Sequence, residues 1–214
     1  MIKGVCISMN KKINLEATLL ISKGQHRACY YHPLMPDKCI KVHLNEECNR
    51  ETIREIKYYK KIADKSFSAP IIAQYHGVIK TNLGLGYVFD LIKDYSGEVS
   101  KTLSYYLSEK MLCEKYKMGI SQAYNRMKTL AEQHAIVTMT LKPYNILYRL
   151  RNQDEGDLII IDNLGCANLF PLAYYSEFFA RQKLSRRFDD FEKTLMHEYG
   201  IKLSFSIIMD IQGN

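Results

Sequence analysis

Short apolar runs separated by turn residues dominate the first ninety residues of the chain. Runs at 17–21, 28–32 and 38–43 are rich in strand-forming residues and predict three strands. Two further runs, 71–80 and 85–91, flank a short polar turn and predict a β-hairpin. One helix is expected among these strands, over residues 49–63, because apolar residues recur there at three-residue intervals: Ile53, Ile56, Tyr59 and Ile62.

The second half of the chain has a helical pattern. A short amphipathic segment around residues 103–107 precedes a long predicted helix over 116–134, and a final helix is expected over 185–199 with Gly200 as its stop signal. The apolar contacts expected from the long helix are Met118, Ala123, Met127, Leu130 and Ala131. Those expected from the final helix are Phe188, Phe191, Leu195 and Tyr199. The pattern therefore favours an α+β protein.

Composition narrows the class of protein. The 214 residues suffice for one domain of two lobes or for two small domains, and no apolar run approaches the ~20 residues that span a bilayer. The first residues lack the pattern of a signal peptide, which favours the cytoplasm. Six cysteines without a C-x-x-C pair argue against a zinc ribbon and fit free thiols in a reducing compartment. The net charge of +7 permits anionic ligands such as nucleotides without specifying one.

The clearest chemical signal lies between residues 140 and 165. Lys142 and Asn145 stand in a loop before one apolar run, and Asp162 ends a second apolar run seventeen residues after Asn145. Two strands joined by a hairpin would bring Asn145 and Asp162 close together at one end. An amide oxygen and a carboxylate at one point, with a lysine beside them, predict a site for a hard cation and a phosphate.

This stretch resembles the catalytic core of the protein kinases. Leu141-Lys142-Pro143-Tyr144-Asn145 is similar to the kinase catalytic loop, which implies that Lys142 contacts the transferring phosphate and that Asn145 holds magnesium. Asp162-Asn163-Leu164-Gly165 is similar to the metal-binding Asp-x-Gly segment, with one extra residue before the glycine. Thr140 occupies the position of the kinase catalytic Asp. A threonine is no base near neutral pH, so activity is expected to be weak or to use another base.

Three upstream residues extend the resemblance. Lys41 is predicted to share a strand face with Cys39 and His43, opposite Ile40 and Val42. The resemblance implies that Lys41 pairs with the α- and β-phosphates. The alternative is a solvated lysine on an edge strand.

The resemblance implies that Glu55, on the first helix, pairs with Lys41, and Glu51 is the alternative. Either glutamate could instead be an ordinary solvated charge on the surface of the helix. Gly24 is implied in a hairpin that covers the phosphates, although by itself it fits a plain turn.

The chain as a whole resembles the bacterial YrbL family, the PhoP regulatory network proteins, which are kinase-like in sequence. The resemblance implies one bilobal kinase-like domain over 1–214, with a small antiparallel β lobe holding one helix at about 13–92, a hinge at 93–97 and a mainly helical lobe at 98–214. Residues 166–171 would be a short remnant of an activation segment.

The implied function is that of a phosphotransferase-like protein that binds ATP and Mg²⁺, and its partners would be a nucleotide and a protein partner or substrate. The alternative is a non-catalytic binding module in a bacterial stress or two-component regulatory network. A nucleic-acid-binding function is the weakest hypothesis, since the basic cluster at Arg181, Lys183, Arg186 and Arg187 fits a solvated face and no aromatic-interleaved basic motif is present.

Overall fold

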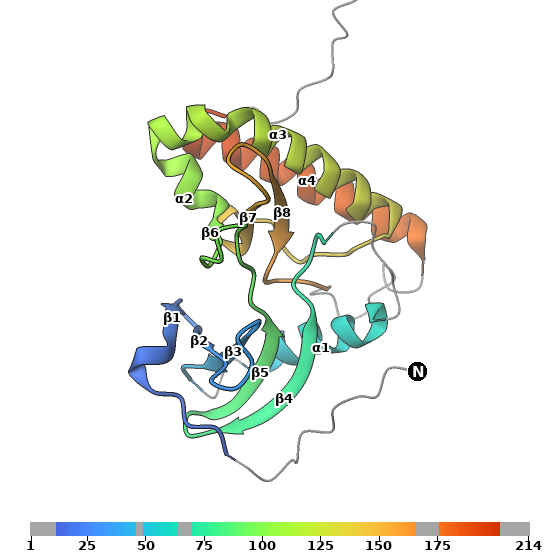
Figure 1. Cartoon of the computed structure of the whole chain (residues 1–214). Helices are drawn as coiled ribbons and strands as arrows, with labels where there is room; N and C mark the ends of the chain where they lie inside the picture. Colours follow the sequence, from blue (N-terminus) through green and yellow to red (C-terminus); the bar gives the residue numbers. More distant parts are fainter. Residues whose placement is uncertain (1–11, 46–48, 64–69, 166–175, 202–214) are drawn as a thin grey trace, which may run out of the picture. The chain divides into compact units, whose positions relative to one another are not determined.

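The computed structural model describes residues 12–45, 49–63, 70–165 and 176–201 (Figure 1). Within them the chain forms four α-helices and two antiparallel sheets, so the expected α+β class is confirmed. The strands are β1 Leu20–Lys23, β2 Arg27–Tyr31, β3 Lys38–His43, β4 Tyr75–Thr81, β5 Gly84–Asp90, β6 Lys101–Thr102, β7 Ile146–Leu150 and β8 Gly156–Ile160. The helices are α1 Asn49–Ile62, α2 Leu103–Ser108, α3 Lys110–Gln133 and α4 Glu177–Tyr199, with short 3-10 turns at Ala17–Leu19 (η1) and Pro143–Asn145 (η3).

The chain divides into two compact units. Unit 1 holds residues 1–53 and 74–91, and unit 2 holds residues 54–73 and 92–214. Helix α1 is therefore divided between the units after Ile53. Residues 70–73, shortly before β4, belong to unit 2, where Ile72 forms a parallel bridge with Ile160.

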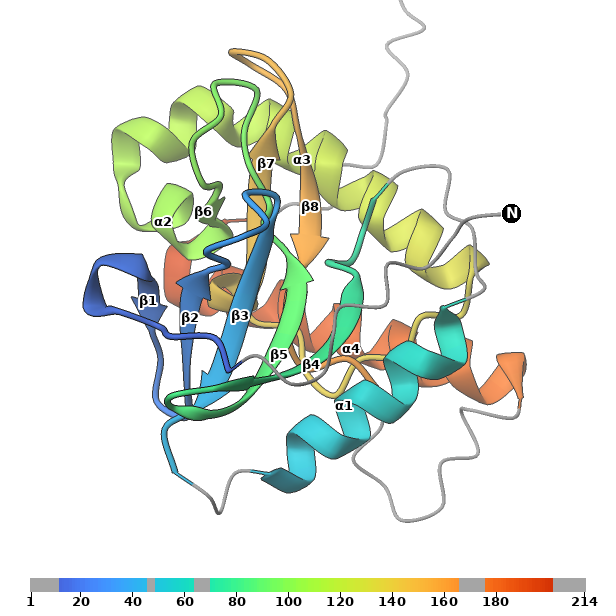
Figure 2. The same ribbon diagram turned by 60° about the horizontal axis from the view of Figure 1, so that its bottom comes forward.

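Unit 1 is built on a five-stranded antiparallel sheet with the order β1-β2-β3-β5-β4 (Figure 2). Strand β3 is central, and its Ile40 and Val42 face a core that includes Ala28 and Val88. The period of two along β3 therefore separates the apolar face from the face that carries Lys41, as the sequence predicts. Three titratable groups lie together at one end of the sheet.

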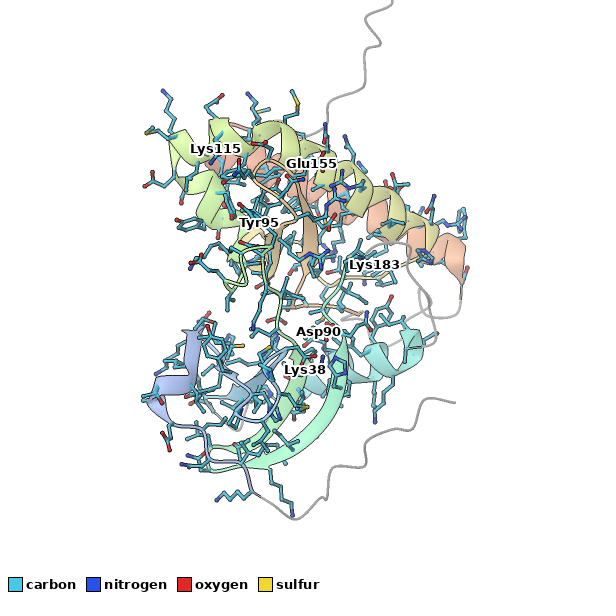
Figure 3. The ribbon with its side chains drawn as sticks, viewed as in Figure 1. Lys38, Asp90, Tyr95, Lys115, Glu155 and Lys183 are labelled. Carbon is cyan, nitrogen blue, oxygen red and sulfur yellow. The ribbon has the colours of Figure 1, made fainter. Side chains whose placement is uncertain are left out.

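Lys38 and Asp90 lie close together at that end (Figure 3), with the Lys38 Nζ 3.1 Å from Asp90 Oδ1. The His76 Nε2 lies 2.6 Å from the same oxygen. Lys38 and Asp90 are direct partners in the register of β3 and β5. The ion pair therefore joins the first residue of β3 to the last residue of β5.

Unit 2 packs helices against the β6-β7-β8 sheet, with α3 against β8 and α4 beside α3 (Figure 1). At Gly119 the α3 backbone lies close to the β7–β8 hairpin. A Cβ atom there would clash with the Asp154 carbonyl and the Tyr148 hydroxyl. Helix α4 ends as the sequence predicts, because Gly200 adopts a left-handed φ of 65° and its N–H donates to the Met196 carbonyl.

Several expected boundaries were wrong, each for a local reason. Residues 17–19 form a 3-10 turn rather than the start of the first strand. The strand expected over 71–80 begins at Tyr75, because Ile71–Ala73 are all buried in unit 2 rather than alternating in a sheet. Helix α4 begins at Glu177, since buried Ala180 and Leu184 extend its apolar stripe backwards.

The long helix also differs from its expected packing. Met118 was expected to make apolar contacts, yet it is 75% exposed, while Ile120 and Tyr124 are buried on that helix. Among the described residues, no helix combines the length and the apolar character that crossing a membrane requires. The expected activation-segment remnant at 166–171 lies outside the described residues.

Candidate functional site

The loop that precedes β7 places Lys142 and Asn145 at the two ends of one turn. The Asn145 N–H donates to the Lys142 carbonyl at 2.9 Å, closing the η3 turn. Pro143 fits the start of this turn, because its fixed φ suits a helical position and its missing N–H is not needed there. The three-residue spacing read from the sequence is therefore one tight helical turn.

The β7–β8 hairpin brings Asn145 and Asp162 to the same end. Ile146 is paired with Ile160, and the Ile161 N–H donates to the Asn145 carbonyl at 3.0 Å. Asp162 is the next residue after Ile161, so the expected convergence of the two chain positions is confirmed. Their role as metal ligands stays a prediction.

A set of hydrogen bonds ties the loop to the segment after β8. The Asn163 Nδ2 donates to Thr140 Oγ1 at 3.1 Å. The Thr138 hydroxyl lies within hydrogen-bond distance of the carbonyls of Thr140 and Asn163, at 3.0 and 2.9 Å. The Asn163 N–H donates to Asp162 Oδ1 at 2.7 Å, so the same residue also orients the carboxylate.

Asn163 is a site residue that sequence reasoning missed. Its φ of 63° is left-handed, a conformation that asparagine tolerates better than most residues. The signal in the sequence was the extra residue between Asp162 and Gly165. That residue allows the backbone to reverse while the Asn163 side chain reaches Thr140.

Lys41 lies on the central strand of unit 1 rather than on an edge. Its side chain is 8% exposed, and its Nζ lies 4.6 Å from the centre of the Phe89 ring. The interpretation as a solvated edge lysine is therefore wrong, since burial over an aromatic ring holds the ammonium in a cation–π contact. Cys29 faces Lys41 across the sheet, directly opposite in the register of β2 and β3.

Glu55 is buried, with 2% of its surface exposed. The interpretation as a solvated surface charge is therefore wrong for Glu55. A carboxylate is buried only at a cost that its surroundings must offset, and such groups are enriched at functional sites. The structure does not describe the side chain of the alternative, Glu51, and the pairing of Glu55 with a lysine stays a prediction.

Gly24 lies in the exposed turn between β1 and β2, where its N–H donates to the Arg27 carbonyl at 2.9 Å. A Cβ atom at this position would meet the nearest atom, the Arg27 carbonyl oxygen, at an ordinary 3.5 Å. The turn therefore does not itself require glycine. The closeness of Gly24 to a phosphate stays a prediction.

Comparison with known proteins identifies the family of this chain. The family model described as "PhoP regulatory network protein YrbL" matches residues 13–196. The chain belongs to the YrbL family. "Uncharacterized protein YrbL" of Escherichia coli (strain K12) is 34% identical over 176 residues, which cover 81% of this chain and 83% of the relative. The protein of the same name from Shigella flexneri matches with the same figures.

The family match spans all of the candidate residues of this YrbL-family chain, from Gly24 to Asp162. The family description links the chain to the PhoP regulatory network. Among the described residues, no group of three or more His, Cys, Asp and Glu side chains could hold a metal. Asn145 and Asp162 nevertheless fit Mg²⁺, which usually takes one or two protein oxygens and completes its shell with water and substrate phosphates.

Lys142 is the exposed cation of the YrbL loop. A hydrogen bond with the Tyr144 hydroxyl is the main cause that raises the pKa of Lys142. The negative charge of Glu198 raises this pKa a little further. The ammonium also lies 5.5 Å from the centre of the Tyr144 ring. Lys142 therefore keeps its positive charge well above neutral pH, as contact with a phosphate requires.

Proposed function

We propose that this protein binds ATP with Mg²⁺ and transfers the γ-phosphoryl group to a hydroxyl acceptor. The observation that carries this proposal is the backbone bond from the Ile161 N–H to the Asn145 carbonyl. That bond holds the backbone of residue 145 beside residue 161, so that Asn145 and Asp162 belong to the same end of the hairpin, and the η3 turn adds Lys142. Phosphoryl transfer depends mainly on positioning and charge stabilisation, which such groups supply.

The proposal gives each candidate residue one role. Asn145 and Asp162 hold the metal, which neutralises charge on the β- and γ-phosphate oxygens when bound. Lys142 contacts the transferring phosphoryl group, and Lys41 contacts the α- and β-phosphates. Glu55 orients Lys41, and the turn at Gly24 covers the phosphates. We expect a cytoplasmic acceptor or partner, and a role in the regulatory network named in the family description.

Thr140 favours a second candidate, a nucleotide-binding module without catalysis. Its hydroxyl accepts a hydrogen bond from Asn163 and cannot take a proton near neutral pH. Loss of a general base typically lowers a rate by about 10²- to 10⁴-fold. A protein of this kind would act in its regulatory network by changing conformation when it binds ATP.

Thermal unfolding with and without ATP and Mg²⁺ tests the nucleotide site. A ligand at 100 times its dissociation constant stabilises by about 2.7 kcal/mol, and for a chain of this size that raises the Tm by roughly 5–10 °C. We expect this rise to need Mg²⁺ and to vanish in Asp162→Asn, which keeps an oxygen that can accept the Asn163 N–H. No rise in the wild type at any ATP concentration would refute both candidates.

Asp154→Asn is the matched control for Asp162→Asn. It removes one negative charge from the same hairpin, but at the exposed tip rather than at the end that carries Asp162. The five residues of β8 separate the tip from that end, which corresponds to roughly 17 Å in an antiparallel strand. The control variant should keep the full rise. Release or transfer of the labelled γ-phosphate then separates the two candidates, since only the phosphotransferase turns over.

A further inference from the structure

Unit 2 contains a pocket of about 370 Å³ between the loop at 140–144 and one face of α4. The helix contributes Arg187, Asp190, Thr194 and Glu198, whose three- and four-residue spacing places them on one side. Its buried residues Phe188, Phe191 and Leu195 lie at other positions of the helix. The volume falls in the range of small-molecule sites.

The charges around the pocket balance. Lys142 and Arg187 supply two cations, and Asp190 and Glu198 supply two carboxylates. Hydroxyl groups of Thr140 and of other lining residues add neutral donors and acceptors. A ligand with both charges, an anionic and a cationic group on one small molecule, complements such a lining better than an ion of one sign.

Arg187 lines the pocket, and its guanidinium has hydrogen-bonding capacity that the described residues do not fill. Its Nη1 lies 3.4 Å from Asp190 Oδ2, whereas its buried Nε has no acceptor among the residues that the structure describes. A guanidinium offers five donors in a planar fork that suits a carboxylate. The prediction from the sequence that Arg187 belongs to a solvated basic face therefore misses its half-buried place beside a pocket.

The pocket shares two residues with the candidate phosphoryl-transfer site. Lys142 lines it, and so does Thr140, whose hydroxyl is bonded to Asn163 next to Asp162. A molecule in the pocket would thus lie beside the residue proposed to contact the transferring phosphate. Glu198 is close enough to Lys142 to affect its pKa.

We propose that this pocket binds the acceptor, and that the acceptor is a free amino acid that bears a side-chain hydroxyl. This rests on the proposed phosphotransferase function. The neighbouring Arg187 and Asp190 bind the carboxylate and the ammonium, which are attached to one carbon atom of such a ligand. The hydroxyl points toward Lys142 and Glu198.

The transfer step balances with the groups at hand. The acceptor oxygen forms a bond to the γ-phosphorus while the bond from that phosphorus to the β,γ-bridging oxygen breaks, and ADP leaves. The hydroxyl proton passes to the Glu198 carboxylate. Glu198 thereby supplies the base that Thr140 does not.

Calorimetric titration with free amino acids, in the absence of nucleotide, tests the pocket. The probes are L-serine, L-threonine and L-homoserine, compared with L-alanine, ethanolamine and glycerate, which each lack one of the three groups. At least one hydroxy amino acid should bind to the protein. Ethanolamine and glycerate should bind to the protein at least tenfold more weakly than that amino acid. Tighter binding of an N-acetylated, C-amidated serine peptide would overturn the proposal in favour of a protein segment.

Paired variants of α4 locate the binding. Arg187→Gln should weaken amino-acid binding by about 10- to 100-fold, the usual effect of losing a charged hydrogen bond. Arg186→Gln removes the same charge from an exposed neighbour that does not line the pocket, and it should bind normally. Thermal unfolding without ligand checks that Arg187→Gln is folded. Equal losses in both variants would overturn the assignment.

A second pair tests the proton acceptor. Glu198→Gln should lower kcat for transfer to the bound amino acid by about 10²- to 10⁴-fold while the ATP-dependent rise in Tm stays. Asp189→Asn, an exposed carboxylate of α4 outside the pocket lining, should leave kcat unchanged. An unchanged kcat in Glu198→Gln would overturn its role.

The failures of the two proposals are distinguishable. An ATP-dependent rise in Tm without binding of any amino acid overturns the acceptor pocket and leaves the nucleotide site intact. Binding of an amino acid without any effect of ATP overturns the phosphotransferase function, and with it the pocket's role as an acceptor site.

Discussion

Removal of the Tyr58 hydroxyl should loosen the segment that leads into the candidate site. Tyr58, on α1, is buried, and its hydroxyl accepts from the Val137 N–H at 2.7 Å and donates to the Ala135 carbonyl at 3.4 Å. Both partners lie just before the loop that carries Thr140. Tyr58→Phe keeps the ring and removes both hydrogen bonds.

The expected size of the effect follows from the two distances. The longer bond contributes little, since 3.4 Å is beyond the usual range for a hydroxyl donor. The shorter bond satisfies the N–H of Val137, which is 1% exposed, so Tyr58→Phe leaves this buried donor without its acceptor. An unsatisfied buried donor costs about 1–3 kcal/mol. For a chain of this size that corresponds to a Tm lower by roughly 2–12 °C.

Urea denaturation and amide hydrogen exchange measure the two parts of this prediction. The free energy of unfolding should fall by about 1–3 kcal/mol, and exchange at the Val137 amide should accelerate by roughly 5- to 150-fold if local opening carries the whole cost. Tyr95→Phe is the control, because Tyr95 is 57% exposed. A loss below about 0.5 kcal/mol, the usual range of surface substitutions, would refute the reasoning.

Three further perturbations follow from the geometry. Gly119→Ala should destabilise unit 2 in urea denaturation, because its Cβ would clash with the Asp154 carbonyl. This clash should outweigh the gain of about 1 kcal/mol that helix propensity alone predicts. A more stable variant would contradict the close packing. Burial raises the pKa of the Asp90 carboxyl, but hydrogen bonds from His76, from a backbone amide and from Lys38 outweigh this and hold the pKa below its ordinary value. The ionised Asp90 therefore stabilises the fold above about pH 4, the ordinary aspartate pKa, and this stabilisation is lost as the pH falls through the lower pKa of the folded state. Asp90→Asn should flatten the fall of the unfolding free energy at acid pH. An identical fall in the variant would exclude the ion pair as its cause. Thr140→Asp should restore phosphoryl transfer in the Glu198→Gln background, because it adds a carboxylate to the loop that carries Lys142. An inactive double variant that still binds ATP would count against the missing-base explanation.

Local patterns were sufficient to predict most elements. Strand β3 was predicted at its observed bounds because a short run of strand-forming residues can be recognised without knowledge of its neighbours. The hairpin that joins Asn145 to Asp162 was predictable for the same reason, since strand pairing across a short tip fixes which ends meet. Ile71–Ala73 were misassigned because a run of buried residues looks like a strand wherever it lies.

The parts of the site that were missed depend on contacts between distant segments. From the sequence, Arg187 is indistinguishable from the neighbouring surface cations. It lines a pocket because α4 packs beside the loop at 140–144. Asn163 needed a left-handed backbone that no propensity scale predicts for a single residue. The burial of Lys41 and Glu55 could not be derived from their neighbours in sequence, because each is a charged residue whose typical place is the surface.

The discontinuity of unit 1 has a consequence for how the protein is made. Strand β5 lies between β3 and β4 in the sheet, so β3 has no partner on that side until residues 84–90 have been synthesised. Residues 54–73, which are synthesised earlier than β5, belong to unit 2, whose remainder begins only at residue 92. Neither unit can therefore complete its core during translation before the ribosome has passed the end of β5. A fragment that stops at residue 73 would expose an open edge of β3, which invites strand pairing between chains.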